Sequence, residues 1–299
     1  MHKNVICINC KNSAPLFFEA KDVNRRISKE VFSYYRCQTC DLIFLKPVPK
    51  NLGDFYAKDY YEIPGSIKEH ETRAKKLQQW KIDLVNRFSK KGKLLEIGPA
   101  YGLFAYLAKQ SGFDVTAIEM DARCCDYLRD VIGINVVNDA NTSAAISTLP
   151  KFDVIVFWQV LEHLIDPMTV LEVAAEHLLP GGVLIFDTPN PNAFQFKVLG
   201  KYWTHIDAPR HLTLIPVGLV VSKLSQAGLR PELLTSADKS ANGFNGFGWA
   251  FSFKNFFSSA FLGMAAHLFG RVLAKVLIPA ERTGWRGSTY TVVFRKDHA

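Results

Sequence analysis

Two pairs of cysteines near the start of the chain have a spacing that suits metal binding. Cys7 and Cys10 form one CxxC pair, and Cys37 and Cys40 form a second. Each pair offers two thiolates, and four thiolates complete the tetrahedral ligand set that Zn²⁺ prefers. Because four thiolates leave no open position on the ion, we expect a structural rather than a catalytic zinc site.

The residue after the second cysteine of each pair is informative about local backbone shape. Many zinc knuckles have glycine there, because φ is positive at that position. This chain has Lys11 and Asp41 instead. Asp adopts positive φ easily and Lys less so, which makes Lys11 the less usual of the two residues at a knuckle position.

A glycine turn marks a second candidate site, in the run LLEIGPAYG at residues 94–102. Gly98 and Gly102 would let the backbone approach a bound group, and the helix start that follows offers free N–H donors. The GxxxG spacing differs from the GxGxxG of dinucleotide sites, and Glu96 would repel a pyrophosphate but attract an amino group. The turn therefore favours an amino-acid-bearing nucleoside such as S-adenosylmethionine over NAD.

Further cofactor-binding candidates follow the next strands. Glu119 ends the run DVTAIE, where its carboxylate could accept both hydrogen bonds from a ribose diol. Asp139 could accept a hydrogen bond from the adenine amine, while Ala140 offers its backbone N–H. Met120 and Gln159, at the ends of the second and fourth strands, are expected to complete the cofactor site.

A parallel sheet is needed to bring these residues together. From residue 93, short apolar runs alternate with helical stretches, which is typical of βαβ units. The runs FDVIVFW and GGVLIFD are apolar at successive positions, as expected of strands covered by helices on both faces. Asp166 and Pro167 suit the start of a helix, and Pro180-Gly181-Gly182 should end it before the next strand. A further helix should follow Val217 and end at Gly228.

Three regions of the sequence differ in composition and in the pattern of apolar residues. Residues 1–51 form a zinc-ribbon-like module, and 52–92 form a helical lead-in, in which the spacing of Leu77, Trp80, Leu84 and Phe88 predicts one helical face. Residues 93–299 form the main domain, including an apolar helical insertion at 242–280 before a last strand.

Taken together, LLEIGPAYG, AIEMD, VNDA and FDVIVFWQVLEHLIDP resemble the successive motifs of class I S-adenosylmethionine-dependent methyltransferases. The resemblance covers residues 93–234. It implies a Rossmann-like, doubly wound, seven-stranded sheet with one antiparallel strand, for which STYTVVFRK is the candidate. Ala100 stands where a third glycine is common in the family and is included among the cofactor-binding residues.

The cysteine ribbon followed by this core is similar to methyltransferases of bacterial sugar and surface-glycan pathways, and related ones methylate quinone precursors. The resemblance implies methyl transfer to a small-molecule acceptor, which we expect to be a hydroxyl of a glycan or of a lipid-linked, isoprenoid-like intermediate. The stretch TPNPNAFQFKVLGKYWTHIDAPRHLTLI also looks like these relatives. It follows the fifth strand, where the acceptor cleft should open.

Histidines are the candidates for taking a proton from such a hydroxyl. His205 and His211 lie in the loop after the fifth strand, and His163 follows the fourth strand in VLEHL. The alternative is that these histidines simply bond backbone groups. Methyl transfer from a sulfonium also gains much of its rate from alignment in a dry pocket, so a base is optional.

The phenylalanine-rich region leaves three interpretations open: a lid over an apolar pocket, a helix at a membrane surface, or a partner-binding surface. Eight of the 22 phenylalanines lie between Phe244 and Phe269. The charge-free run at 255–270 has 16 residues, short of the roughly 20 that span a bilayer. The basic residues that follow would suit anionic headgroups, so we also expect peripheral membrane contact through 242–286.

Length, charge and the first residues of the chain limit the other functions and locations to be considered. The chain has 299 residues and a net charge of +8, of which +6 falls in residues 239–299. An RNA methyltransferase using the zinc module and the basic tail is one alternative, but the ribbon has no basic cluster, so we do not expect a nucleic-acid partner. A non-catalytic membrane or assembly factor is another. The first residues lack an apolar export segment, which predicts a cytoplasmic chain, with peripheral contact at the inner membrane surface.

Overall fold

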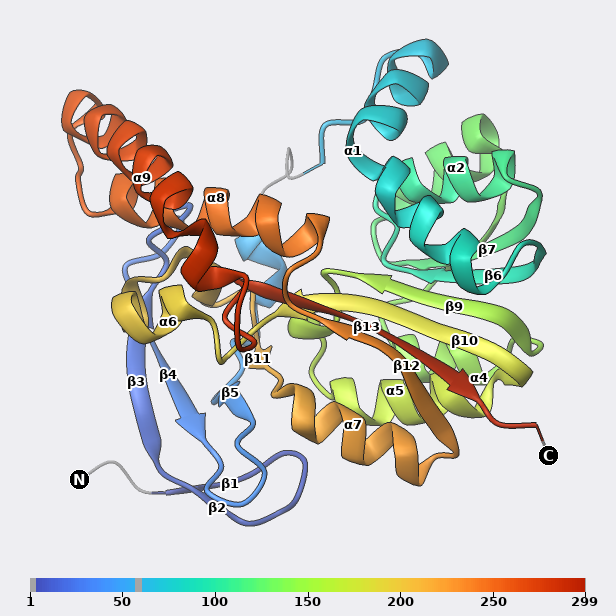
Figure 1. The fold of residues 1–299 in the computed structure, drawn as a ribbon, viewed down its shortest axis with the longest axis horizontal. Helices are drawn as coiled ribbons and strands as arrows, with labels where there is room; N and C mark the ends of the chain where they lie inside the picture. Colours follow the sequence, from blue (N-terminus) through green and yellow to red (C-terminus); the bar gives the residue numbers. More distant parts are fainter. Residues whose placement is uncertain (1–3, 57–60, 299) are drawn as a thin grey trace.

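Seven strands form one central sheet in the computed structural model, which describes residues 4–56 and 61–298 (Figure 1). The order across the sheet is β12-β13-β10-β9-β6-β7-β8, and β13 runs antiparallel to both of its neighbours. This confirms the prediction of a doubly wound α/β sheet whose antiparallel strand is STYTVVFRK. In chain order the strands are β6 (Gly92–Ile97), β7 (Phe113–Glu119), β8 (Asn135–Asn138), β9 (Phe152–Trp158), β10 (Leu178–Pro189), β12 (Leu229–Thr235) and β13 (Thr289–Lys296).

Strand β9 shows why the sheet is buried on both faces. Val154 and Val156 belong to the hydrophobic cluster on one face, whereas Ile155 and Phe157 belong to the cluster on the other. The first face packs against α1 (Ile67–Phe88), α2 (Leu103–Gln110) and the π-helical turn at 128–132 that follows α3 (Ala122–Tyr127). The second face packs against α4 (Thr142–Ser147), α5 (Pro167–Glu176) and α7 (Val217–Gln226).

Several helix boundaries follow from local chemistry, and others do not. Asp166 accepts a hydrogen bond from the Thr169 amide at the start of α5, as its sequence predicts. Residues 180–182, however, lie within β10 and do not end that helix, which stops at Glu176. On α1, Leu77 is exposed and does not belong to the buried face, whereas His70 is buried.

The N-terminal module is joined to the main domain by a strand. It contains β1 (Val5–Ile6), β2 (Ser13–Ala14), β3 (Leu16–Lys21), β4 (Val31–Arg36) and β5 (Ile43–Leu45). A short strand from the main domain, β11 (Thr213–Leu214), pairs with β5 and completes a four-stranded sheet in the order β11-β5-β4-β3. The segment that bears the candidate His211 is therefore held directly against the cysteine module.

The insertion before β13 is a helical hairpin, made of α8 (Lys239–Asn255) and α9 (Ala260–Glu281) (Figure 1). The two helices approach closely, since a Cβ atom on Gly270 would lie 2.6 Å from the Trp249 carbonyl oxygen. The segment between β10 and β11 forms α6 (Phe194–Leu199) and two 3-10 turns, at 200–202 and 204–206. Phe196 and Trp203 from this segment stack on each other.

Candidate functional site

A cavity of about 1570 Å³ opens at the carboxyl ends of β6, β7 and β9. This is the edge of an open α/β sheet where ligands bind. Residues from α8, from the β10–β11 segment and from the N-terminal module also line it, among them Phe244, His205 and Asn24. The cavity therefore joins the predicted cofactor residues to the predicted acceptor residues in one space.

Glu96 is the buried carboxylate at the cofactor end of the cavity. It is 3% exposed, and its Oε2 atom has no hydrogen-bond partner among the described residues. Burial raises the pKa of Glu96 to about 8, while the nearby positive charge of Lys81 opposes that rise. A buried carboxylate oxygen without a hydrogen-bond partner is costly, and a ligand ammonium group would supply a partner for Oε2.

The turn after β6 has the strained backbone that a glycine turn allows. Gly98 has a φ of 64°, and a Cβ there would lie 2.8 Å from Val160. Ala100 also adopts the left-handed region, at a φ of 54°, a conformation that glycine adopts more readily than alanine. Gly102 caps α2 and packs under Leu128, and it is not among the cavity-lining residues that the structure describes.

Glu119 lines the cavity but is already engaged by the backbone. Its Oε2 accepts a hydrogen bond from the Ala100 amide at 2.9 Å, and its Oε1 accepts from the Met120 and Asp121 amides at 2.8 and 2.9 Å. Since Oε1 is fully used, the free lone pair on Oε2 is what remains for a ribose hydroxyl. Glu119 thus also holds the glycine turn in place.

The remaining cofactor candidates form the rim and floor of the same cavity. Met120, Asp139 and Ala140 line it from exposed positions. Gln159 has a φ of 56°, donates its backbone N–H to Asp187 and leaves its buried Nε2 without a partner among the described residues. A buried amide donor facing the cavity suits a ligand that carries acceptor oxygens.

His163 and His211 lie together at the other end of the cavity, with ring centroids 4.6 Å apart. His163 Nδ1 lies 3.1 Å from the Arg210 carbonyl oxygen, and His211 Nδ1 lies 2.8 Å from that of His205. Because a carbonyl oxygen only accepts, His211 Nδ1 carries the proton, and its Nε2 has no hydrogen-bond partner among the described residues. His163 Nδ1 also lies 3.0 Å from the Tyr56 hydroxyl, which can donate as well as accept, so only the His211 tautomer is set by a carbonyl alone. Burial lowers the pKa of His163, and it lowers the pKa of His211 to about 3, so both rings are neutral near pH 7.

His205 has a different environment from the other two histidines. Its Nε2 donates to the Phe244 carbonyl oxygen, at 3.1 Å, and burial lowers its pKa to about 4. Its ring packs against Trp203, Phe244 and Phe247. Although it lines the cavity, His205 ties the β10–β11 segment to α8, which is the backbone-bonding alternative that the sequence left open.

Glu162 is a site residue that the sequence analysis did not select. It is fully buried, Thr188 donates to its Oε2, and its Oε1 has no partner among the described residues. Burial raises the pKa of Glu162 to about 8. Glu162, His163 and His211 each offer a ligand atom within 4.8 Å of the others, so this group could also hold a divalent cation.

Buried charges fix the loop that carries His211. Arg210 is fully buried and contacts Asp22 of the N-terminal module at 2.8 Å and Asp207 at 2.7 Å. Tyr34 of β4 donates its hydroxyl hydrogen to the His211 carbonyl oxygen at 2.8 Å. The cysteine module therefore positions His211 through an ion pair, a hydrogen bond and the β5–β11 pairing.

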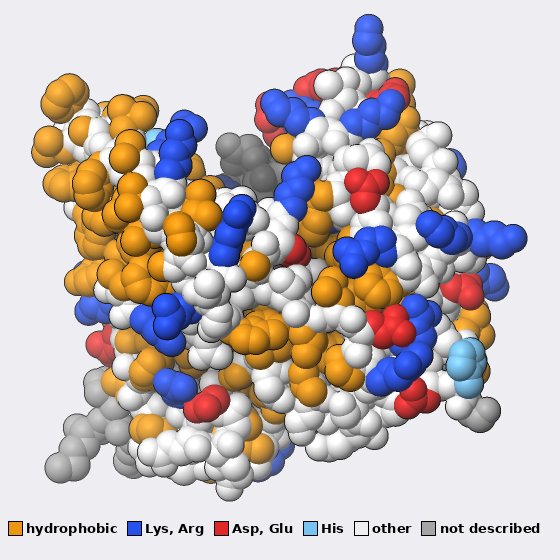
Figure 2. Space-filling view, in the orientation of Figure 1, with side chains coloured by type: hydrophobic (Ala, Val, Ile, Leu, Met, Phe, Trp, Pro, Cys, Tyr) orange, Lys and Arg blue, Asp and Glu red, His pale blue; other side chains and the backbone are white. Residues whose placement is uncertain are grey.

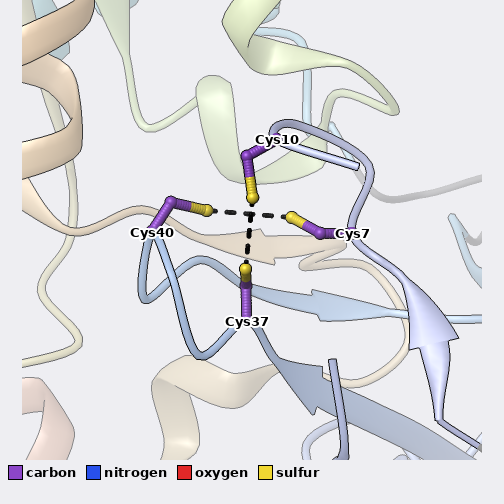
Figure 3. A group of neighbouring side chains, drawn as sticks. All are labelled: Cys7, Cys10, Cys37 and Cys40. Atoms are coloured by element: carbon purple, nitrogen blue, oxygen red, sulfur yellow. Dashed lines mark hydrogen bonds between the residues drawn. The ribbon is translucent and has the colours of Figure 1, made fainter. Parts of the chain in front are cut away.

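The four sulfur atoms of Cys7, Cys10, Cys37 and Cys40 point toward one centre (Figure 3). Sγ–Sγ separations are 3.7 Å for Cys7 and Cys40 and 3.3 Å for Cys10 and Cys37, and all four atoms lie within 4.8 Å of one another. Thiolates on a tetrahedral zinc ion, each about 2.3 Å from the metal, stand about 3.8 Å apart. The arrangement fits such an ion.

The backbone around these cysteines has the expected knuckle shape. Lys11 and Asp41 have φ values of 61° and 59°. Their amides donate to the carbonyl oxygens of Cys7 and Cys37, respectively. Both residues therefore adopt the positive φ that is usual after the second cysteine of a zinc knuckle.

The seven-stranded Rossmann-like sheet with this cavity at its carboxyl edge is the architecture of class I S-adenosylmethionine-dependent methyltransferases. A family described as a methyltransferase domain matches residues 70–232, which is more than half of the chain. The chain therefore belongs to this methyltransferase family.

Curated relatives match the core of the chain. The ubiquinone biosynthesis O-methyltransferase of Pectobacterium carotovorum is 29% identical over 125 residues, covering 40% of this chain and 52% of that protein. The protein of the same description from Pseudomonas fluorescens is 31% identical over 138 residues, covering 44% and 59%. The chain thus spans little more than half the length of these relatives.

A solved structure shares the fold. In the complex between the Haloferax volcanii Trm112 methyltransferase activator and its methyltransferase, one chain matches with a TM-score of 0.51 and 15% identity, covering 78% of this chain and 95% of that one. At this identity the likeness concerns the fold alone.

Proposed function

We propose that the chain transfers a methyl group from S-adenosylmethionine to a hydroxyl of a small amphiphilic acceptor, such as a lipid-linked, isoprenoid-like or glycan intermediate. One observation carries the proposal: a single cavity joins Glu96, whose buried Oε2 has no hydrogen-bond partner among the described residues, to the neighbouring imidazoles of His163 and His211. The O-methyltransferase relatives support oxygen as the acceptor atom.

The residues present suit each part of the cofactor. Glu96 would pair with its ammonium group, and the turn around Gly98 would lie against its amino-acid portion. Glu119 Oε2 would accept from a ribose hydroxyl, and Asp139 from the adenine amine. The cofactor supplies the electrophilic methyl group, and the chain supplies alignment and a pocket shielded from water.

The two imidazoles would receive the acceptor's proton. As the new carbon–oxygen bond forms, positive charge develops on the oxygen and its hydrogen becomes acidic. A weakly basic nitrogen can then accept that hydrogen, provided that it is unprotonated at the start. The lowered pKa values of His163 and His211 keep both rings neutral at neutral pH, and the Nδ1 hydrogen bond of His211 leaves its Nε2 unprotonated.

We further propose that Cys7, Cys10, Cys37 and Cys40 bind one structural Zn²⁺. The convergent sulfur atoms and the positive φ at Lys11 support this. The ion would act on the reaction through structure, by stabilising the module that holds the His211 loop.

The acceptor class can be tested by incubating the chain with methyl-labelled S-adenosylmethionine and separate lipid, glycan and RNA fractions. We expect label in the lipid or glycan fraction. Label in RNA alone would reject the proposed acceptor class in favour of the RNA methyltransferase, and no label in any fraction, with no cofactor bound, would favour a non-catalytic factor.

Binding of the cofactor should release a proton near neutral pH. Because burial raises the pKa of Glu96 to about 8, this carboxyl is mostly protonated at pH 7 and must ionise to pair with an ammonium group. Affinity should therefore rise between about pH 6 and about pH 8. Titration calorimetry in two buffers of different ionisation enthalpy measures the release. Glu96→Gln should bind about tenfold more weakly and release no proton; wild-type binding without release would reject this role.

Glu119 should contribute to recognition of the ribose. We expect Glu119→Ala to weaken cofactor binding by about 1 to 3 kcal/mol. Because Glu119 also holds the Ala100 amide, binding of S-adenosylhomocysteine and of its 2′- and 3′-deoxy analogues should be compared in both proteins. At least one deoxy analogue should lose affinity in the wild type but lose less in the variant. Equal losses in both would restrict Glu119 to supporting the turn.

A further inference from the structure

The helical hairpin exposes a continuous set of apolar side chains, which we call the α8–α9 apolar surface (Figure 2). Phe261 is 82% exposed and Val276 is 68% exposed. Monomeric soluble proteins seldom expose so many large apolar groups together. The exposed members are Phe256, Phe257, Phe261, Leu262, Met264, Leu268, Phe269, Val272 and Val276.

Helix α9 is unlike a core helix. It is 22 residues long, its most apolar window has a mean hydropathy of 1.6, and only 17% of that window is buried. By length and composition it could cross a bilayer. However, its first residue is joined to α8 by a short turn, its last turn leads into β13, and Arg271 and Lys275 lie along it. These ties to the folded domain favour a helix lying in the plane of a membrane surface.

The charge around this surface is of one sign. Between residues 239 and 280 the sequence has four Lys or Arg and no Asp or Glu. Lys254, Arg271 and Lys275 are exposed. The carboxylate that follows, Glu281, is fully buried and accepts hydrogen bonds from Gln195 and Trp249. A positive, apolar surface complements an anionic bilayer, whereas burial against a second identical copy would bring like charges together.

Helix α8 connects this surface to the cavity. Phe244, Phe247 and Phe251 of α8 line the cavity, and α9 packs closely on α8 at Gly270. One helix therefore forms a wall of the acceptor site and also supports the exposed apolar helix. This combines two interpretations that the sequence left as alternatives, the lid and the membrane helix.

We propose that the α8–α9 apolar surface docks on an anionic bilayer, and that the acceptor is a membrane amphiphile whose polar head enters the cavity beside α8. The identity of the acceptor as a membrane amphiphile rests on the proposed methyl transfer, whereas docking on the bilayer does not. A protein partner or a second copy on this surface is the competing outcome.

Sedimentation with vesicles tests docking without any acceptor. The intact chain should bind vesicles containing phosphatidylglycerol, and high salt should weaken that binding. The double variant Phe261→Ser/Leu268→Ser should lose binding, and Arg271→Glu/Lys275→Glu should bind at least roughly 30-fold more weakly, since two attractive charges are lost and two repulsive ones are introduced. Val31→Ser/Val131→Ser, at exposed apolar positions outside the hairpin, and Lys90→Glu/Lys91→Glu are the matched controls and should bind normally.

Light scattering measures the oligomeric state and calorimetry measures cofactor binding, and together they distinguish membrane docking from dimerisation and from failure of the proposed function. The docking proposal would be overturned if the chain is a dimer through this surface and does not bind anionic vesicles. It would also be overturned if the control variants lose vesicle binding to the same extent as the hairpin variants. Cofactor binding is measured on the same proteins and should not change in the hairpin variants. Normal cofactor binding without vesicle binding would reject docking alone, and vesicle binding without cofactor binding would reject the proposed function alone.

Discussion

Replacing Cys37 by serine is expected to remove the bound zinc and to lower the free energy of unfolding by roughly 3 kcal/mol or more. Metal-binding energy is folding energy in small thiolate modules, so loss of one ligand is felt by the whole module. Cys37 is fully buried and faces the other three sulfur atoms. Metal analysis and thermal unfolding provide the measurements.

The matched control is Cys124→Ala, which removes another fully buried thiol outside the cluster. It should keep one zinc ion per chain, although it also creates a small cavity. Wild-type protein that contains no zinc when purified with zinc present, or a Cys37→Ser variant that retains it, would contradict the proposed metal site.

Loss of zinc should also affect methyl transfer and cofactor binding to different extents. The module holds the His211 loop through Arg210, Tyr34 and the β5–β11 pairing. Glu96 and Glu119, the residues proposed to bind the cofactor, instead lie on β6 and β7. We therefore expect the zinc-free variant, while folded, to lose methyl transfer more than cofactor affinity. Equal loss of both would indicate general unfolding.

Replacing His211 by alanine should lower kcat by about 10²-fold to 10⁴-fold, the range for a positioned proton acceptor. Cofactor affinity should stay close to that of the wild type, because Glu96 and the glycine turn are unchanged. The assay follows label from S-adenosylmethionine into the lipid fraction that the wild type modifies. His163→Ala should show a similar defect, and the double variant should be less than additive, since both imidazoles serve one proton.

His177 offers a control histidine. Its Nδ1 also bonds a backbone carbonyl oxygen, that of Val173, but it lies at the end of α5 and not among the cavity-lining residues that the structure describes. His177→Ala should leave kcat near the wild-type value. A His211→Ala variant with full kcat would exclude this imidazole from the reaction and restrict it to the backbone hydrogen bond that it makes.

Local patterns predicted most of the central fold. The apolar runs that become β9 and β10 are buried on both faces, and Asp166 caps α5 as its neighbourhood indicates. Topology then placed Glu96 and Glu119 in one cavity, because parallel strands end at the same edge. These inferences need only short-range sequence information and one fold rule.

Other features depend on contacts that sequence spacing does not reveal. Strand β11 has two residues and is defined by its partner β5, and Arg210 meets Asp22 across 188 positions. Glu162 sits in VLEHL without any local sign of burial, yet packing encloses it completely. His205 was selected for its place in the loop, but its Nε2 is engaged by a carbonyl oxygen on α8, which only the folded chain brings near.

A crystal structure of the intact chain with S-adenosylhomocysteine would test the central claim most directly. The account predicts that the ligand occupies the cavity at the ends of β6 and β7, with its ammonium group hydrogen-bonded to Glu96. Its sulfur should face His163 and His211. A ligand bound elsewhere, or a cavity that stays empty at saturating ligand, would contradict the account.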